Sequence, residues 1–487
     1  MIIKTDGKIN LNYIENLCLI FFPGSKFARD EQDTPETPHL ELTQEEEGDD
    51  VVSNAVFSIG EMRASGTGRV NKSENMSWKK SAGVAVIEAG RKLFGFTPSW
   101  GFLIGIRPVK IAAEMLESGL EPVAVRRKLR NEYLLIPKKA SLLTSIAINE
   151  NNIISSLEEN SCSVYISIPF CPTRCAYCSF VSYSTKRLLS MIPEYLQRLV
   201  QDIEKTFALI RRLGKKAVTV YVGGGTPTTL TAQELDFLLS GIEKNCDISS
   251  LREFTVEAGR PDTITEEKLR VIISHGVNRV SINPQTLNDA VLERIGRRHT
   301  AEEFYRAYDI ARKVGVKYIN TDLIAGLPGE GFRKFSKSVD AILALRPDNI
   351  TYHTFCVKKA ADILHSDADI YSRTGGETRK SVDYTQIKSK AAGYVPYYLY
   401  RQKNSMGNLE NVGFSLPGSE GLYNIFIMEE VHSIFACGAG AVTKMVSGKK
   451  ISRAFLPKYP YEYLAMSEED MNAHLRKIEE FYISENS

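Results

Sequence analysis

The sequence lacks the features that define several other classes of protein. No apolar run approaches the length needed to span a bilayer. The charges almost cancel, because 61 Lys and Arg face 59 Asp and Glu, which leaves a net charge of +2. Such a balance argues against a chain held mainly by nucleic-acid phosphates or by an anionic membrane. We therefore expect no nucleic-acid partner and no membrane span.

A secretory signal and a disulfide framework are also missing. The apolar stretch at residues 17–22 is short, follows Glu15 and Asn16, and has no basic start. Three of the eight cysteines crowd into eight residues instead of being distributed in pairs. We therefore predict a cytoplasmic protein, in which thiols stay reduced and cysteines are available for metals.

The length of 487 residues predicts roughly three domains. Residues 1–160 carry no chemical motif, and we interpret them as an accessory N-terminal α/β domain. Residues 84–94 and 108–129 show helical spacing, with basic residues on the outside. The segment 29–50 is rich in Asp, Glu, Thr and Pro, and we predict that it is a disordered insertion.

From residue 161 to 354, short apolar strands alternate with amphipathic helices. The predicted strands are 164–168, 218–222, 253–257, 279–282, 318–323 and 349–353. Thr231 with Glu234, and Thr300 with Glu303, have the spacing of capping boxes that open helices. Strand and helix in alternation imply parallel strands with right-handed crossovers, hence an α/β barrel or an open doubly wound sheet. Residues 355–487 are less regular, and we predict a C-terminal α+β domain or lid.

Cys171, Cys175 and Cys178 follow the first predicted strand with CxxxCxxC spacing. Such a loop wraps three thiolates around one face of a cluster, and thiolate ligation suits iron–sulfur clusters. Structural zinc normally takes four ligands, and no second CxxC or HxxxH stands nearby to complete such a site. Three thiolates on a [4Fe-4S] cluster leave one iron open for chemistry.

This spacing, with an aromatic residue before the third cysteine, resembles the radical S-adenosylmethionine (SAM) enzymes. The resemblance implies a partial (β/α)6 TIM-like barrel whose open iron binds SAM and cleaves it to a 5'-deoxyadenosyl radical. Residues 223–227, Gly-Gly-Gly-Thr-Pro, resemble the glycine-rich edge of that family and follow the second strand, as the family requires. A carboxylate can bind ribose hydroxyls, a guanidinium can pair with the carboxylate of SAM, and amides can contact adenine.

Residues 164–444 further resemble the oxygen-independent coproporphyrinogen III oxidase family. The matching pieces are 164–171, 221–227, 276–280, 322–328 and 346–348. The resemblance implies that Cys171, Cys175 and Cys178 hold a catalytic [4Fe-4S] cluster with Tyr177 beside it. The residues implied to contact SAM are Tyr165, Gly224, Gly225, Thr226, Glu257, Gln285, Arg297 and Asp322.

Three branches of the family differ in recognisable segments. The HemN branch carries a further cysteine where this chain has Phe180, and the HemW branch of haem chaperones carries an HNxxYW motif. The corresponding stretch here, 421–426, has no histidine. Residues 397–413, 429–430 and 438–440, with an added N-terminal domain, resemble most the HemZ-type coproporphyrinogen dehydrogenases.

The resemblance implies oxidative decarboxylation of two propionates of coproporphyrinogen III, which gives protoporphyrinogen IX in haem biosynthesis. A tetrapyrrole substrate and an electron donor such as flavodoxin or ferredoxin would be the partners. The tetra-anionic substrate would need cations, for which Arg298, Arg401 and Lys403 are candidates. Two alternatives stay open: a haem-binding or haem-transfer chaperone without decarboxylase turnover, and a radical SAM enzyme that opens or alters another tetrapyrrole.

Overall fold

The computed structural model describes residues 1–27, 34–105, 107–178, 182–356, 376–402 and 405–486. The chain forms two compact units, which are described separately below. Unit 1 comprises Met1–Asn149 and two later segments that end at Lys380 and Glu410, and unit 2 comprises the rest. Among the described residues, no helix combines the length and the apolar character that crossing a bilayer requires. The three-part domain division stays a prediction of the sequence.

Unit 1 is built on a four-stranded sheet in the order β1-β2-β3-β4, in which β1 is parallel to β2 and the other pairs are antiparallel. Its elements are β1 (Ile2–Asp6), α1 (Leu11–Phe21), β2 (His39–Glu47), β3 (Asp50–Ile59), β4 (Met62–Asn71), α2 (Ser77–Phe94), α3 (Val109–Glu117), α4 (Pro122–Glu132) and α5 (Pro137–Ile154). Helix α2 packs closely on β4 because β4 carries glycines at the contact. A Cβ atom on Gly66 would lie 2.3 Å from the carbonyl oxygen of Ala85.

One expectation for this unit is wrong. The segment predicted to be disordered contains β2, in which Leu40 and Leu42 are buried while Glu41 and Thr43 are exposed. This alternation is the pattern of a strand with one buried face, and the high charge of its other face obscured it. The helical spacing predicted for 108–129 is confirmed. It is divided between α3 and α4, because Gly119 takes a left-handed φ of 88° and Pro122 then opens α4.

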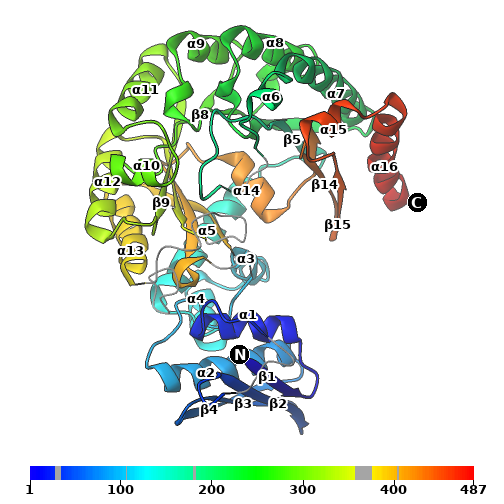
Figure 1. Ribbon diagram of the computed structural model, residues 1–487. Helices are drawn as coiled ribbons and strands as arrows, with labels where there is room; N and C mark the ends of the chain where they lie inside the picture. The colour runs from blue at the N-terminus through cyan, green and yellow to red at the C-terminus, as the bar shows by residue number, and fades with distance from the viewer. Residues whose placement is uncertain (28–33, 106, 179–181, 357–375, 403–404, 487) are drawn as a thin grey trace. The chain divides into compact units, whose positions relative to one another are not determined.

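Unit 2 contains the six predicted strands as six parallel neighbours in chain order (Figure 1). They are β5 (Ser161–Ile168), β6 (Lys216–Gly224), β7 (Glu253–Glu257), β8 (Arg279–Ser281), β9 (Tyr318–Ala325) and β10 (Asn349–Thr354). The helices along this part of the chain are α6 (Lys186–Leu189), α7 (Ile192–Arg212), α8 (Ala232–Glu243), α9 (Glu266–Ser274), α10 (Asp289–Arg294), α11 (Ala301–Val314) and α12 (Phe332–Leu345). Both predicted capping boxes are confirmed, at the starts of α8 and α11. This βα alternation confirms the α/β fold class.

The C-terminal residues add strands to both edges of this sheet. The added strands are β11 (Val395–Arg401), β12 (Glu410–Ser415), β13 (Ile434–Cys437), β14 (Val442–Ser447) and β15 (Lys450–Phe455). The accompanying helices are α13 (Gly376–Ala391), α14 (Leu422–Glu429), α15 (Pro460–Leu464) and α16 (Glu468–Asn486). Strand β12 runs antiparallel to β10, and β13 runs parallel to β5. The sheet therefore contains eleven strands in the described residues, with β5 to β10 at its centre.

Candidate functional site

The cysteine loop follows β5 and is held in place by backbone hydrogen bonds. The N–H of Cys171 donates to the carbonyl of Tyr183 at 3.0 Å, and the N–H of Ala176 donates to Ile295 at 3.0 Å. Cys175 is buried and Cys171 is half-buried, and both are free thiols. Burial raises the pKa of the Cys171 thiol, and the nearby Cys178 and Cys175 raise it further.

Within the described residues, no group of three or more His, Cys, Asp or Glu side chains is arranged around the position of a single metal ion. The three cysteines nevertheless lie on one loop of 8 residues, Cys171 to Cys178, at the end of a central strand. The assignment of this trio to a cluster stays a prediction, supported by the chemistry of the donor set, which suits iron–sulfur ligation.

Arg260, which was not predicted, reaches the cysteine loop from the segment after β7. Its Nη1 donates to the Thr173 hydroxyl at 2.9 Å and to Cys175 Sγ at 3.7 Å. Its Nε and Nη2 pair with both oxygens of Asp262, each at 3.0 Å. The sequence carried a signal for this residue, because Arg260 stands just past Glu257 at the end of a predicted strand. These hydrogen bonds hold Arg260 against the part of the loop that carries Cys175.

Arg297 reaches the same loop from the segment after α10. Its Nη1 donates to the carbonyls of Gly259 at 3.1 Å and Asn283 at 2.6 Å, and its Nε donates to the Tyr177 hydroxyl at 3.2 Å. These bonds fix Tyr177 in the segment between Cys175 and Cys178. The proposed pairing of Arg297 with the carboxylate of SAM is not tested by these contacts.

The predicted glycine edge lies against the start of the cysteine loop. The N–H of Gly225 donates to Ile168 at 2.8 Å, and the N–H of Thr226 donates to Phe170 at 2.7 Å. A Cβ on Gly225 would lie 2.4 Å from the Phe170 carbonyl oxygen, so only glycine fits this approach. The Thr226 hydroxyl lies 3.3 Å from Cys171 Sγ. These contacts therefore hold the glycine-rich edge and the cysteine loop together.

Glu257 and Asp322 belong to one interior network of polar side chains. The Tyr221 hydroxyl donates to Glu257, and His353 lies 3.5 Å from Asp322. Asn320 donates to Asp322 at 2.9 Å. Burial raises the pKa of Glu257 to about 7, with a further contribution from Asp322 that the Tyr221 hydrogen bond opposes. The sequence interpretation missed Tyr221 and His353, although both stand on predicted strands.

Gln285 has a backbone and a side chain that are both unusual. Its φ is 67°, a left-handed value that is uncommon outside glycine. Hydrogen bonds of 3.0 Å from its N–H to Asp322 and of 2.9 Å from Ile324 to its carbonyl hold this conformation beside β9. The side chain is buried, and its Oε1 has no hydrogen-bond partner among the residues that the structure describes. A buried acceptor without a partner is costly and indicates a group that a ligand would satisfy.

Three tyrosines form a layer beside this network. The ring of Tyr423 on α14 stacks on Tyr221 with centroids 4.4 Å apart, and Tyr165 lies 6.2 Å from Tyr221 and 6.3 Å from Tyr423. The backbone N–H of Tyr423 donates to Glu253 at the start of β7 at 3.2 Å. Tyr165 was predicted as a site residue, whereas Tyr423 was missed because α14 is about 200 residues away from β6 in the sequence.

The residues present fit a cluster with bound SAM in three respects. No disulfide joins the three cysteines in the described residues, the Gly225 backbone leaves no room for a side chain, and the buried Gln285 Oε1 lacks a donor there. A ligand with amino and amide-like donors would satisfy that oxygen. The cluster would be held by Cys171, Cys175 and Cys178. SAM would contact the interior polar groups, which include Glu257, Gln285 and Asp322.

The three cations suggested for the substrate have different outcomes. Arg401 is buried in unit 1, where it donates to the carbonyls of Leu103 and Asn408, so its proposed contact with substrate is wrong. It was misassigned because nothing local distinguishes a buried arginine from an exposed one. Arg298 is exposed and stays a candidate. Lys403 lies outside the described residues, as does Phe180.

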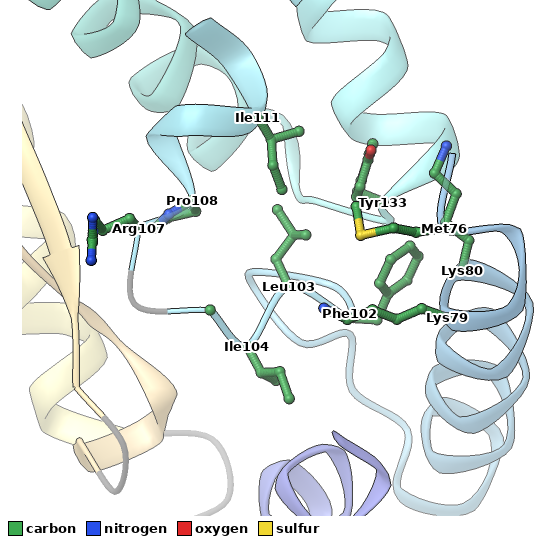
Figure 2. Close-up of a pocket in the computed structure, with 11 residues that line it drawn as sticks. Met76, Lys79, Lys80, Phe102, Leu103, Ile104, Arg107, Pro108, Ile111 and Tyr133 are labelled. Carbon is green, nitrogen blue, oxygen red and sulfur yellow. The ribbon is translucent and has the colours of Figure 1, made fainter. Parts of the chain in front are cut away.

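A separate cavity of about 80 Å³ lies in unit 1 and contains none of the predicted site residues (Figure 2). Its lining includes Met76, Lys80, Phe102, Ile111 and Tyr133. Pockets that enclose small-molecule ligands measure roughly 300–1,000 Å³, so this cavity is too small for SAM or a tetrapyrrole.

Comparisons with known proteins agree with this geometry. The family model described as the radical SAM superfamily matches residues 165–342. The chain is 39% identical over 393 residues to the oxygen-independent coproporphyrinogen-III oxidase-like protein HemZ of Bacillus subtilis, which covers 80% of this chain and 78% of that protein. It is also 31% identical over 281 residues to the haem chaperone HemW of Lactococcus lactis, covering 57% of this chain and 68% of that protein.

Among solved structures, coproporphyrinogen III oxidase (HemN) of Escherichia coli is similar with a TM-score of 0.50 and 21% identity. The match covers 67% of this chain and 73% of that one. At this identity the likeness concerns the fold alone. It supports the α/β architecture of a radical SAM protein that the strand order of unit 2 indicates.

Proposed function

Since the chain belongs to the radical SAM superfamily and, within it, to the family of HemZ and the oxygen-independent coproporphyrinogen III oxidases, we propose that it decarboxylates coproporphyrinogen III oxidatively. The cofactors of this superfamily are a [4Fe-4S] cluster and SAM. Each of two propionate side chains would lose one hydrogen atom to the carbon radical that SAM supplies, one electron to a one-electron acceptor, and carbon dioxide, and would become a vinyl group. The product would be protoporphyrinogen IX.

The observation that carries the proposal is the buried polar network beside the cysteine loop. Glu257, Gln285 and Asp322 come from three successive segments of the parallel sheet and converge there. When bound, the cofactors supply a carbon radical strong enough to take hydrogen from an unactivated propionate C–H. Glu257, once ionised, would accept hydrogen bonds from ribose hydroxyls, and Gln285 Oε1 would accept one from the adenine amine.

The aromatic layer and the arginines would serve supporting roles. Tyr165, Tyr221 and Tyr423 fill the interior beside the network and keep water away from the reacting groups. Arg260 would hold the cysteine loop in place through its contacts with Thr173 and Cys175. Exposed Arg298 would attract a propionate carboxylate.

The test is anaerobic turnover of the reconstituted protein with coproporphyrinogen III, SAM and a chemical reductant. The expected product, identified by mass spectrometry, is lighter than the substrate by the mass of two molecules of carbon dioxide and four hydrogen atoms. Absence of this product from protein with an intact cluster would refute the proposal. A product of another mass would indicate a different reaction on a tetrapyrrole.

A haem chaperone is the second candidate, and the similarity to HemW favours it. One contact weighs against it. The HemW motif histidine would fall at residue 421, but a Cβ on Gly421 would lie 2.9 Å from the Tyr397 hydroxyl. Haem titration discriminates the two functions, because a chaperone would bind haem stoichiometrically and shift its Soret band.

A further inference from the structure

An aromatic surface adjoins the cysteine loop and is not used by the proposed chemistry. We define this tyrosine patch as Tyr183, Tyr459 and Tyr461. The rings of Tyr183 and Tyr459 have centroids 5.4 Å apart, and Tyr459 stacks on Tyr461 at 5.3 Å. Tyr459 is 37% exposed and Tyr461 is 48% exposed. Large apolar side chains clustered at the surface are typical of interaction sites.

The tyrosine patch is connected directly to a predicted cluster ligand. The carbonyl of Tyr183 accepts the backbone N–H of Cys171 at 3.0 Å, and the N–H of Tyr183 donates to Pro169 at 2.9 Å. The Tyr183 hydroxyl donates to the carbonyl of Lys458 at 3.4 Å, which joins the cysteine loop to the start of α15. One hydrogen bond therefore separates a residue of the patch from Cys171.

The surroundings of the patch are predominantly basic. We define the basic rim as Arg174, Lys186, Arg187 and Lys458, all of which are exposed. From Cys171 to Pro193 the sequence contains no Asp or Glu. Lys458 lies 5.9 Å from the centre of the Tyr459 ring. The acidic side chain of Glu462 is exposed and accepts the backbone N–H of Tyr459 at the start of α15.

We infer that the tyrosine patch and basic rim are the docking surface for an acidic one-electron donor protein of the flavodoxin class. This inference rests on the proposed function, because a donor is needed only if the cluster turns over. One electron would pass from the reduced flavin of the donor to the oxidised cluster, so the flavin loses the electron that the cluster gains. Transient redox complexes use small interfaces steered by opposite charge, and this surface combines aromatic contacts with four cations.

The decisive measurement follows reduction of the oxidised cluster by photoreduced flavodoxin in stopped flow, without substrate. The double variant K186E/R187E should lower the second-order rate constant about tenfold or more at low salt, and the loss should shrink as salt is added. Reduction by titanium(III) citrate should be unchanged. The variant Y461A should also slow reduction by flavodoxin, because it removes an exposed contact without touching the cysteine loop.

A matched control reverses two exposed cations on α11, which belongs to the β8-to-β9 crossover and lies far along the sheet from α15 (Figure 1). The variant R306E/K313E changes the net charge equally and should reduce normally with both reductants. Equal flavodoxin rates for K186E/R187E and R306E/K313E would overturn the inference. If K186E/R187E fails to take up a cluster, K458E carries the same test from another element.

The outcomes also separate this inference from the proposed function. Cluster reduction is measured without coproporphyrinogen, so it can succeed where turnover fails. If K186E/R187E is reduced normally by flavodoxin but raises the KM for coproporphyrinogen in assays driven by titanium(III) citrate, the rim binds substrate carboxylates and the inference is wrong.

Discussion

The buried carboxylate of Glu410 in unit 1 is paired, whereas the buried Gln285 Oε1 in unit 2 has no hydrogen-bond partner among the described residues. In unit 1, Glu410 accepts a hydrogen bond from Trp100 at 2.9 Å and forms an ion pair with Lys139. The side chains of Glu410 and Lys139 are 0% and 1% exposed. Burial opposes ionisation of Glu410, but the ion pair with Lys139 outweighs it and keeps the pKa of Glu410 below its ordinary value.

In unit 2, by contrast, Gln285 Oε1 is buried without a partner, and burial raises the pKa of Glu257 to about 7. Burial of a polar group is unfavourable unless hydrogen bonds compensate it. The contrast therefore distinguishes two uses of buried polarity. The paired Glu410 carboxylate stabilises the fold. The Gln285 oxygen is available to a ligand because Gln285 lies beside Asp322 in the site, unlike Gln44 Oε1 of unit 1, which also lacks a partner in the described residues.

The largest expected effect comes from removing a cluster ligand. Cys175→Ala should abolish both the brown colour of the reconstituted protein and its activity, because two remaining thiolates cannot hold the cluster. The measurement is iron content with product analysis after anaerobic reconstitution. Cys246→Ala is the matched control, since Cys246 lies outside the loop and should be dispensable. Retained activity in C175A would remove the cluster from the mechanism.

The next largest effect tests the satisfied pair of unit 1. Lys139→Met should lower the free energy of unfolding by about 3–5 kcal/mol, because it leaves the Glu410 carboxylate buried without its counter-charge. Denaturant titration measures this change. The double variant K139M/E410M should recover most of the loss, since replacing both partners by apolar groups is often neutral. SAM affinity per folded molecule should not change in either variant.

The parts of this comparison differ in how far sequence could predict them. The cysteine loop, the six central strands and both capping boxes depend on local spacing, and the structure confirms the strands and the boxes. Glu410 stood inside a segment quoted for its family likeness, but its partners Lys139 and Trp100 are 271 and 310 residues away. No local pattern encodes such contacts. The same reason explains why Tyr423 was missed and Arg401 was misassigned.

A smaller effect is expected from Glu257→Gln, which tests the buried polar network of unit 2. An amide accepts weaker hydrogen bonds than a carboxylate, so SAM should bind about 10-fold to 100-fold more weakly, as measured by anaerobic titration. In the wild type the affinity should rise as the pH passes through about 7, where Glu257 ionises beside Tyr221, Asp322 and His353. In E257Q this dependence should disappear.

The same substitution should also change the stability of the protein, by an amount that depends on pH. The pKa of Glu257 is raised in the fold to about 7 from its ordinary 4.5, so the fold favours the protonated carboxyl. The stabilisation that Glu257 gives is complete at pH values below its pKa in the unfolded chain. It is lost as the pH rises through about 7. The ligand-free variant should therefore be more stable relative to wild type at pH 8 than at pH 5. An opposite trend in urea titrations would contradict the burial of this carboxyl.

The smallest expected effect is also the sharpest test of the comparison. Gln285→Met keeps the length of the side chain but removes the buried oxygen that has no partner. If that oxygen awaits a ligand, the ligand-free protein should be unchanged or more stable by about 1 kcal/mol, while SAM binds several-fold more weakly. For Lys139→Met we expect the reverse, which is lower stability with unchanged binding of SAM. Should Q285M instead lose stability and keep its SAM affinity, Gln285 would be a structural residue, and an unsatisfied buried atom would not mark the ligand site in this chain.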